Sequence, residues 1–307
     1  MSTDLTNIEL TDSDKAALQP VVNRLAALTA VSTTRLIHNA IDEPVQDSLV
    51  GKAKKADLSD AYDQARQRLN SAEDHFRTIL TVLTRSDTLP NFSLFTLARG
   101  AAVATVHARY LLERTIDEPT RLGRGLSARL QNQEQLRKVE RGEDEPADED
   151  VSEDKVLSPD EFFAERVEHL RERAEANGIA TVPDRKDNVI GFGERWPSDT
   201  DLFDSYMPGI GKLYFQYLSG YAHSLPWAQL PMHRAQPTDD PKVKLVPTDI
   251  NLPVFAAVLN GALNLYDETI GLVLAHAGYP PMVWIEAKKG VQQRSCTQQG
   301  STTTTPS

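Results

Sequence analysis

Ser219 and His223 form the first pair whose types and spacing could do chemistry. They stand four residues apart in an aromatic-rich segment, so on a helix the hydroxyl and the imidazole would meet one turn apart, with Phe215 on the same face. A titratable imidazole among aromatic rings such as Tyr217 and Tyr221 is typical of the wall of a ligand pocket. The pattern is also typical of an aromatic core helix whose polar groups satisfy local hydrogen bonds, and both interpretations stay open.

Arg99 and His107 form a second pair, in a segment that is apolar nearly all round. Eight residues are little more than two helical turns, so both side chains leave nearly the same face. A buried arginine needs an acceptor, and Val103 between the two provides none, so the partner must come from another helix. We expect the helix of Ser219 and His223 to pack opposite and to form a small polar pocket. A satisfied structural network is the alternative. The candidate ligand-binding residues are Arg99, His107, Tyr217, Ser219, Tyr221 and His223.

Arg68 and His75 form a third pair, separated by six residues. Helical ribonucleases of the HEPN type use an arginine followed after four to six residues by a histidine, so this spacing is similar to theirs. A chain with this many arginines and histidines also contains such spacings by chance. Because the pair lies on a helix whose polar face points outward, we interpret it as a chance match and keep a HEPN-like endoribonuclease or toxin-type enzyme as the alternative function.

The remaining motifs give no cofactor or metal site. Gly209-Ile210-Gly211-Lys212 resembles the end of a phosphate-binding loop, but the required earlier glycine is absent and Leu213 replaces the serine or threonine. No serine lies in a nucleophile elbow, and the zinc-binding His-Glu-x-x-His pattern is missing. Cys296 is the single cysteine, which excludes an internal disulfide and multi-cysteine metal sites. We therefore expect no cofactor and no metal.

The charge balance restricts the class of partner. The 307 residues include 33 Lys and Arg and 44 Asp and Glu, a formal charge of -11, whereas a nucleic-acid surface requires a basic field. The N-terminus has no secretory signal pattern, and the longest uncharged runs are shorter than a spanning helix. We expect a cytoplasmic protein with a protein or small-molecule partner, no membrane contact and no nucleic acid, and a homodimer stays open.

The elements that must position these residues are helices. Apolar residues recur every three or four positions, and almost no segment has the strict alternation of a strand. The segment that carries Arg99 is apolar on all sides, which is typical of a helix in the middle of a bundle. We predict an all-α fold, a single bundle of six or seven long helices. The expected helices span residues 13–41, 59–84, 92–113, 119–141, 159–177, 210–224 and 254–278.

Three further segments mark the organisation of the chain. Residues 142–157 contain an acidic stretch with almost no apolar residue and are predicted to be a disordered linker inside a bundle domain of residues 12–285. Ser158, Pro159 and Glu161 are typical of a capping box that starts the next helix. Residues 179–197 contain several prolines and glycines and are predicted to be a loop. Residues 286–307 are predicted to be a disordered tail.

Two segments, Leu97–Leu136 and Phe215–Trp227, resemble a widespread group of helical proteins from actinobacteria. In that group an Arg-led buried helix ends near a Leu-Leu pair, a basic helix follows, and a later helix reads aromatic-x-x-Leu-Ser-x-x-x-His-x-x-x-Trp. The group usually has an acidic residue four positions after the arginine, where this chain has Val103, and often an arginine where Gln216 stands. The resemblance implies a helical fold more than an activity. It rests on Arg99, Leu111-Leu112, Arg121, Arg124, Phe215, Leu218-Ser219, His223 and Trp227.

The function that these observations favour is a non-catalytic binding or regulatory protein. The three pairs offer a place for a ligand, but none of them completes a recognised catalytic motif. The HEPN-like ribonuclease differs from such a binding protein in a testable way. The ribonuclease needs Arg and His side chains that converge on a positively charged surface.

Overall fold

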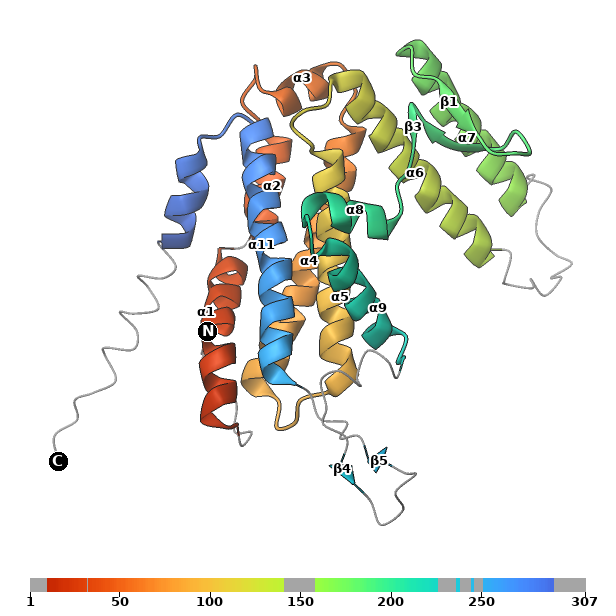
Figure 1. Ribbon diagram of the computed structural model, residues 1–307. Coiled ribbons are helices and arrows are strands. Elements are labelled where there is room, and N and C mark those ends of the chain that lie inside the picture. Colours follow the sequence, from red (N-terminus) through yellow and green to blue (C-terminus); the bar gives the residue numbers. More distant parts are fainter. Residues whose placement is uncertain are drawn as a thin grey trace, which may run out of the picture. The chain divides into compact units, whose positions relative to one another are not determined.

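The computed structural model describes residues 10–31, 33–140, 158–225, 236–237, 244–245 and 251–289. Helices make up most of these residues, which confirms the predicted all-α fold class (Figure 1). The helices are α1 (Asp12–Ala30), α2 (Thr33–Asp42), α3 (Leu49–Lys55), α4 (Asp60–Arg85), α5 (Asn91–Leu111), α6 (Glu118–Glu140), α7 (Pro159–Ala176), α8 (Asp199–Tyr206), α9 (Gly211–Ala222) and α11 (Leu252–His276). Residues 281–289 are also helical.

Most of the long helices lie where the sequence predicts them, and the differences are local. The helix expected over residues 13–41 is two helices, because α1 ends at Ala30 and α2 begins at Thr33. The sequence around this break, Val31-Ser32-Thr33-Thr34, consists of β-branched and hydroxyl residues with weak helix propensity. Two short helices, α3 and α8, were not predicted, since seven or eight residues carry too little periodicity to detect.

The contacts group the chain into two compact units. The first unit comprises Met1–Lys52, Ala65–Tyr110 and Ser198–Ser307. The second comprises Ala53–Gln64 and Leu111–Pro197. Three of the boundaries fall inside α3, α4 and α5, so each of these helices contributes residues to both units. All three candidate pairs of the sequence analysis belong to the first unit.

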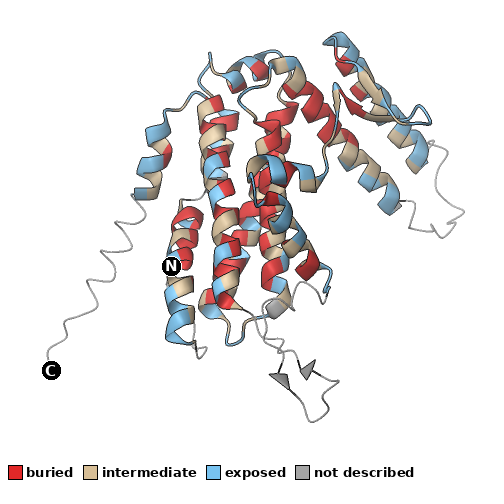
Figure 2. Ribbon diagram, in the orientation of Figure 1, coloured by how far each residue is buried: buried red, intermediate tan, exposed pale blue. Residues whose placement is uncertain are grey.

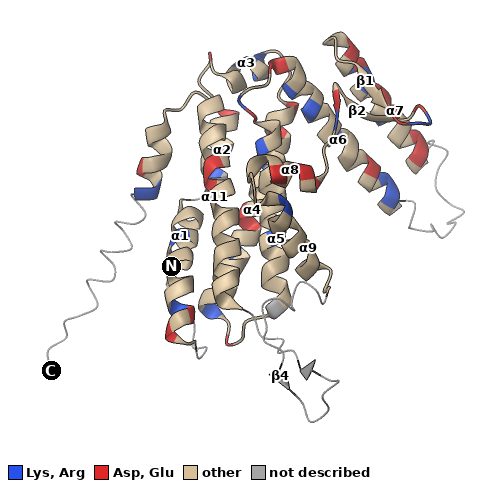
Figure 3. Ribbon diagram, in the orientation of Figure 1, with Lys and Arg blue, Asp and Glu red and all other residues tan. Residues whose placement is uncertain are grey.

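The core of the first unit is built around α11. Asp267 and Glu268 are its only acidic residues and it has no Lys or Arg, so its ribbon is almost entirely uncharged in Figure 3. Buried residues occur along the whole length of α11 (Figure 2), which packs against α1 and α2. Aromatic rings fix its contacts with α4 and α5: Phe76 of α4 meets Tyr266 edge-on at 5.1 Å, and Phe95 of α5 meets Phe255 at 5.2 Å. A helix with so few charges is stable only when its neighbours cover it.

α5 has the central place predicted for it, except along one stripe. Its buried residues contact α9 and α11, and Gly100 lies directly against the imidazole of His75 on α4. Ala101 is fully buried, whereas Ala104 is only partly buried. The partly buried stripe contains Arg99, Gly100, Val103, Ala104 and His107.

The second unit packs α6 and α7 against a small sheet. Leu122, Leu126 and Leu130 form the predicted apolar stripe of α6, and they pack against Leu170 of α7 and against Phe192. α7 begins at the predicted capping box, in which Ser158 accepts a hydrogen bond from the Glu161 N–H and Glu161 accepts one from the Ser158 N–H. It ends before Gly178, whose φ of 68° is the left-handed conformation that glycine adopts without strain.

The prediction of a loop over residues 179–197 was wrong in part. Three short antiparallel strands lie there, in the order β1 (Thr181–Pro183), β2 (Val189–Phe192) and β3 (Glu194–Arg195). Strands of two to four residues carry no readable alternation, and their pairing depends on contacts with α6 that the local sequence does not encode. The Ser127 hydroxyl of α6 accepts a hydrogen bond from the Phe192 N–H at 2.8 Å. β4 (Gln236–Pro237) and β5 (Lys244–Leu245) form a separate antiparallel pair.

Two further predictions concern the ends of segments. The acidic linker, residues 142–157, lies outside the described residues. The tail predicted from residue 286 begins too early, because residues 286–289 continue the helical segment that starts at 281. Trp284 of that segment is 5% exposed and its indole N–H donates to Asp267 at 2.6 Å, a contact between side chains far apart in the sequence. Residues 290–307, with Cys296, lie outside the described chain.

Candidate functional site

Four side chains from three helices of the first unit form a polar cluster on the partly buried stripe of α5. α4 contributes Arg68, α5 contributes Arg99 and His107, and the first residue of α8 contributes Asp199. We call these residues the arginine–histidine cluster. Ser198 fixes the start of α8, because its hydroxyl accepts the Asp201 N–H as the N-cap and leaves Asp199 in the first turn.

Arg68, His107 and Asp199 form a chain of hydrogen bonds. Arg68 Nη1 donates to His107 Nδ1 at 2.8 Å, and His107 Nε2 donates to Asp199 Oδ1 at 2.7 Å. An arginine can only donate and a carboxylate can only accept, so these directions assign the ring proton to Nε2 and leave Nδ1 unprotonated. Both ring nitrogens of His107 are therefore occupied in this arrangement.

Asp199 is the acid that the sequence analysis required from another helix. The hydrogen bond from His107 lowers the pKa of Asp199, and the positive charges of Arg99 and Arg68 lower it further, although burial opposes them. Burial lowers the pKa of Arg68, and the charge of Asp199 counteracts that shift. Asp199 thus stays ionised at neutral pH and stabilises two cations while it is hydrogen-bonded to His107.

Arg99 differs from Arg68 in its contacts. Its guanidinium lies over the ring of Phe215 on α9, with the carbon 5.5 Å from the ring centroid. Its Nε is buried without a hydrogen-bond partner, and no residue in the described ranges forms a hydrogen bond or an ion pair with this side chain. Asp199, whose charge acts on Arg99, is hydrogen-bonded to His107. Arg99 is thus a partly buried cation whose hydrogen-bonding capacity is unused by the described chain.

Tyr217 and Tyr221 lie one turn away from the cluster and around Phe95. The ring of Tyr221 stacks on Phe95 at 3.9 Å, Tyr217 meets Phe95 edge-on at 5.8 Å, and the Tyr217 hydroxyl donates to that of Tyr221 at 3.3 Å. Burial raises the pKa of Tyr217, and the hydrogen bond with Tyr221 raises it further, so the phenol stays protonated. These two tyrosines belong to the aromatic packing between α5 and α9.

The structure does not bring Ser219 and His223 to Arg99 or to each other's side chains. His223 is exposed and follows the last residue of α9, where its backbone N–H donates to the Ser219 carbonyl at 3.0 Å. The described contacts of the pair are limited to this backbone bond. Phe215, on the same face as Ser219, is the residue of α9 that contacts Arg99.

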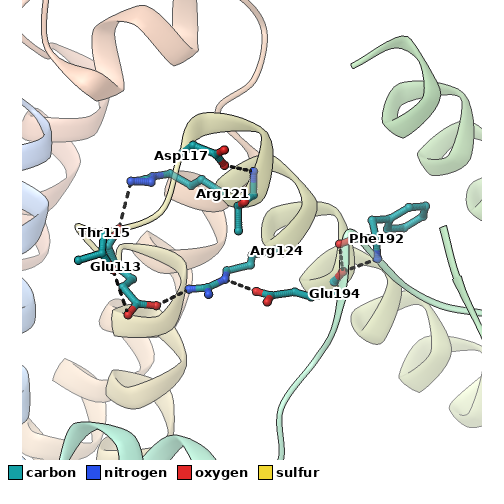
Figure 4. A network of polar contacts seen from close by, with 9 residues as sticks. Glu113, Thr115, Asp117, Arg121, Arg124, Phe192 and Glu194 are labelled. Carbon is teal, nitrogen blue, oxygen red and sulfur yellow. Dashed lines mark hydrogen bonds and ion pairs between the residues drawn. The ribbon is translucent and has the colours of Figure 1, made fainter. Parts of the chain in front are cut away.

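The second unit contains a different polar network, drawn in Figure 4. Arg124 of α6 pairs with Glu113 at 2.8 Å and with Glu194 of β3, which ties the sheet to the helix. Arg121 is only 2% exposed and donates to the carbonyls of Glu113 and Ile116, which close the turn before α6. The basic helix of the sequence analysis therefore uses these charges inside its own unit, in contacts that stabilise the fold.

Comparison with known proteins does not assign the chain to a family. Searches of protein-family models, of curated proteins and of solved structures gave no match. The resemblance to helical proteins of actinobacteria therefore stays a prediction. None of the helices within the described ranges is both long and apolar enough to cross a membrane. Among the same residues, no group of three or more histidines, cysteines or carboxylates is placed to hold a metal ion.

Sequence reasoning identified Arg99 and His107 but missed two members of the cluster. Arg68 was considered only together with His75, and Asp199 was not considered at all. The available signal for Asp199 is the run Ser198-Asp199-Thr200-Asp201, a typical helix N-cap that would have placed a carboxylate at the start of an extra helix. Its pairing with His107, 92 residues earlier, has no local signal.

Proposed function

We propose that this chain is a non-catalytic binding protein that holds a small anionic ligand at the arginine–histidine cluster. The observation that carries the proposal is Arg99, a partly buried guanidinium with neither a hydrogen bond nor an ion pair from the described residues. The charge of Asp199 acts on Arg99, but Asp199 forms its hydrogen bond with His107, so the N–H donors of Arg99 would be satisfied directly by an anion in contact with them. A planar guanidinium also matches the two oxygens of a carboxylate or phosphate group.

The state of His107 supports binding rather than catalysis. A general base needs a free ring nitrogen within reach of the substrate proton. Arg68 and Asp199 occupy both nitrogens of His107. This arrangement of His107 favours recognition of an anion by the cations of the cluster over proton transfer by this histidine.

The proposal is tested by ligand-dependent stabilisation. The purified protein is melted with a panel of small anions: inorganic phosphate, sulfate, citrate and glycerol phosphate. A ligand at 100 times its dissociation constant stabilises the folded state by about 2.7 kcal/mol. Arg99→Met keeps an apolar stem on Phe215 but removes the charge, so we expect it to weaken binding about tenfold to a hundredfold, the value of one or two charge-assisted hydrogen bonds.

The matched control is Arg109→Met. Arg109 lies on the same helix but already pairs with Glu268 and lies over the ring of Tyr206. The Arg109→Met substitution removes one positive charge from α5 but changes no residue of the arginine–histidine cluster. Ligand binding should therefore persist in this variant. The proposal is wrong if no anion stabilises the protein, or if both variants weaken binding equally.

A HEPN-like endoribonuclease is the second candidate, and one observation favours it. Arg68 and His75 lie two turns apart on one face of α4, and His75 makes no side-chain hydrogen bond within the described chain. We expect the purified protein to leave single-stranded RNA intact. Cleavage that is lost in His75→Ala and Arg68→Ala, but kept in Arg66→Ala on the same helix, would favour the ribonuclease over the binding protein.

A further inference from the structure

Asp199 has a carboxylate oxygen that the described chain leaves unpaired. Its Oδ1 accepts a hydrogen bond from His107 Nε2 at 2.7 Å, and no residue of the described ranges donates to its Oδ2. The Asp199 side chain is 32% exposed, so it is open to a small solute. Because the pKa of Asp199 is lowered, the carboxylate is ionised at neutral pH and can only accept hydrogen bonds.

Stacked aromatic rings place this carboxylate beside Arg99. Asp199 and Phe203 are four residues apart on α8 and therefore lie on the same face of that helix. The Phe203 ring stacks on the Phe215 ring of α9, with the centroids 5.2 Å apart, and the Arg99 guanidinium lies over that same Phe215 ring. The charge of Arg99 lowers the pKa of Asp199, yet no hydrogen bond or ion pair joins these two described side chains. A cation with unused donors thus lies next to a carboxylate with an unused acceptor.

This juxtaposition restricts the ligand of the proposed anion site, and the inference rests on that site. An anion bound to Arg99 brings its own oxygens toward Oδ2 of Asp199, and two such acceptors repel each other. A hydrogen-bond donor on the ligand, next to its anionic group, would replace this repulsion with an attractive contact. The charges of Arg68, Arg99 and Asp199 sum to one positive charge, two minus one, which a single carboxylate balances better than a dianion.

We propose that the site binds a small carboxylate that has a hydrogen-bond donor, either a hydroxyl or an ammonium group, beside its carboxyl group. The ligand's carboxylate accepts hydrogen bonds from Arg99, whose planar guanidinium matches two oxygens. The hydroxyl or ammonium group donates to Oδ2 of Asp199, and the bond from His107 to Oδ1 holds that carboxylate in place. Hydroxy acids and amino acids with the donor on the carbon next to the carboxyl group share this chemistry.

Three ligands with the same carbon skeleton isolate the donor. Propionate has no donor, lactate adds a hydroxyl group to the carbon next to the carboxylate, and alanine adds an ammonium group there. Titration calorimetry of the full wild-type chain, at neutral pH and one ionic strength, gives the dissociation constants for both enantiomers of lactate and alanine. We expect lactate or alanine to bind about tenfold more tightly than propionate, the value of one charge-assisted hydrogen bond. The tighter of the two identifies a hydroxy acid or an amino acid as the ligand class, whereas equal binding of all three would overturn the inference without any substitution.

Asp199→Asn assigns the preference to Oδ2. The asparagine oxygen can still accept from His107, but its amide nitrogen replaces Oδ2 and can only donate. We expect this variant to bind lactate and alanine no more tightly than propionate, and to bind propionate at least as tightly as the wild type does, because a negative charge beside Arg99 is gone. Asp201→Asn is the matched control: it removes the other acidic residue from the first turn of α8 and should keep the preference. A preference that survives in Asp199→Asn, whatever the absolute affinities, would overturn the inference.

Failure of this inference can be told apart from failure of the proposed function. If phosphate, sulfate or citrate binds and the binding depends on Arg99, while lactate and alanine bind no better than propionate, the anion site stays and the inference is wrong. If none of these ligands binds, or if Arg99→Met leaves their binding unchanged, the anion site and the inference are both wrong.

Discussion

Gly100 lies where the imidazole of His75 packs against α5. A Cβ atom built on Gly100 would stand 2.6 Å from His75 Nε2, closer than a Cβ atom approaches a neighbouring side chain in folded proteins. Gly271 of α11 offers a matched comparison, because a Cβ there meets nothing within 4 Å. Both positions are helical, so alanine brings the same gain in helix propensity at each and only the steric conflict differs.

We expect Gly271→Ala to stabilise the protein by about 0.5–1 kcal/mol, since it removes the cost of glycine inside a helix. Gly100→Ala should show no such gain, because a forced shift of a packed side chain costs about 1–3 kcal/mol. In a His75→Ala background the gain at position 100 should reappear. Denaturant unfolding of the wild type, Gly100→Ala, His75→Ala and the double variant gives the coupling energy between positions 75 and 100. This coupling energy should exceed about 0.5 kcal/mol. A Gly100→Ala protein as stable as Gly271→Ala would show that His75 does not pack there.

Asp60 begins α4 with a carboxylate that is 1% exposed. Arg129 of α6 lies 2.6 Å from one carboxylate oxygen and Arg173 of α7 lies 2.8 Å from the other. Removing one member of a buried ionic network costs about 3–5 kcal/mol, and the partial exposure of both arginines reduces that cost.

At the level of these elements, we expect Asp60→Asn to lower the free energy of unfolding by roughly 2–4 kcal/mol, because three helices lose their common anion. Asp42→Asn is the control, since Asp42 pairs with Arg66 while half exposed, and such a pair contributes at most about 1 kcal/mol. The measurement is urea unfolding at neutral pH. Equal effects of the two substitutions would contradict the structural role of Asp60.

Asp267 of α11 connects three helical segments of the first unit. It accepts hydrogen bonds from Trp284 at 2.6 Å and Lys288 at 2.7 Å, and Arg24 of α1 lies at 3.2 Å. Burial raises the pKa of Asp267, but the hydrogen bonds from Lys288 and Trp284 and the charges of Lys288 and Arg24 outweigh it, so the folded-state pKa is lowered. A lowered carboxyl pKa adds stability above the unfolded-state value, and that stability is lost as the pH falls through the folded-state value.

We therefore expect Asp267→Asn to lose roughly 1–3 kcal/mol at neutral pH and to differ less and less from the wild type below about pH 4. Trp284 fluorescence reports the loss of this contact. When the indole leaves its buried position, its emission should shift to the red. Glu268→Gln, the neighbouring exposed carboxylate, is the control and should keep both stability and emission. A stability difference that is constant down to pH 2 would contradict the assignment.

The elements show what sequence can and cannot predict. The helix limits of α4, α6 and α7 follow from periodicity and from a capping box at Ser158, both of which are local. The strands of residues 181–195 were not predicted, because they form only when they pair with one another and pack against α6. Arg99 and His107 were predicted because their spacing and apolar setting are local. Asp199 and Phe215 could not be assigned to them, because those contacts form only after α8 and α9 pack on α5.

At the scale of the whole molecule, the two units contain separate contact networks. Asp60 and its arginines belong to the second unit, whereas Asp267 and its partners belong to the first. We expect the effects of Asp60→Asn and Asp267→Asn on the unfolding free energy to add within about 0.5 kcal/mol in the double variant. A larger deviation, measured by urea unfolding, would mean that α4 and α5 transmit stability between the networks.

The boundaries inside α4 and α5 also have a consequence for the order of synthesis. The second unit closes once residue 197 has left the ribosome, whereas Phe95 waits for Phe255, roughly 160 residues later. At about 5–20 residues per second, that interval is on the order of 10–30 s. During it, the apolar sides of α4 and α5 that α11 finally covers are exposed in the nascent chain. Slow translation of the last third of the message would lengthen this interval. A chaperone that binds apolar helices would bind the exposed sides of α4 and α5 during it.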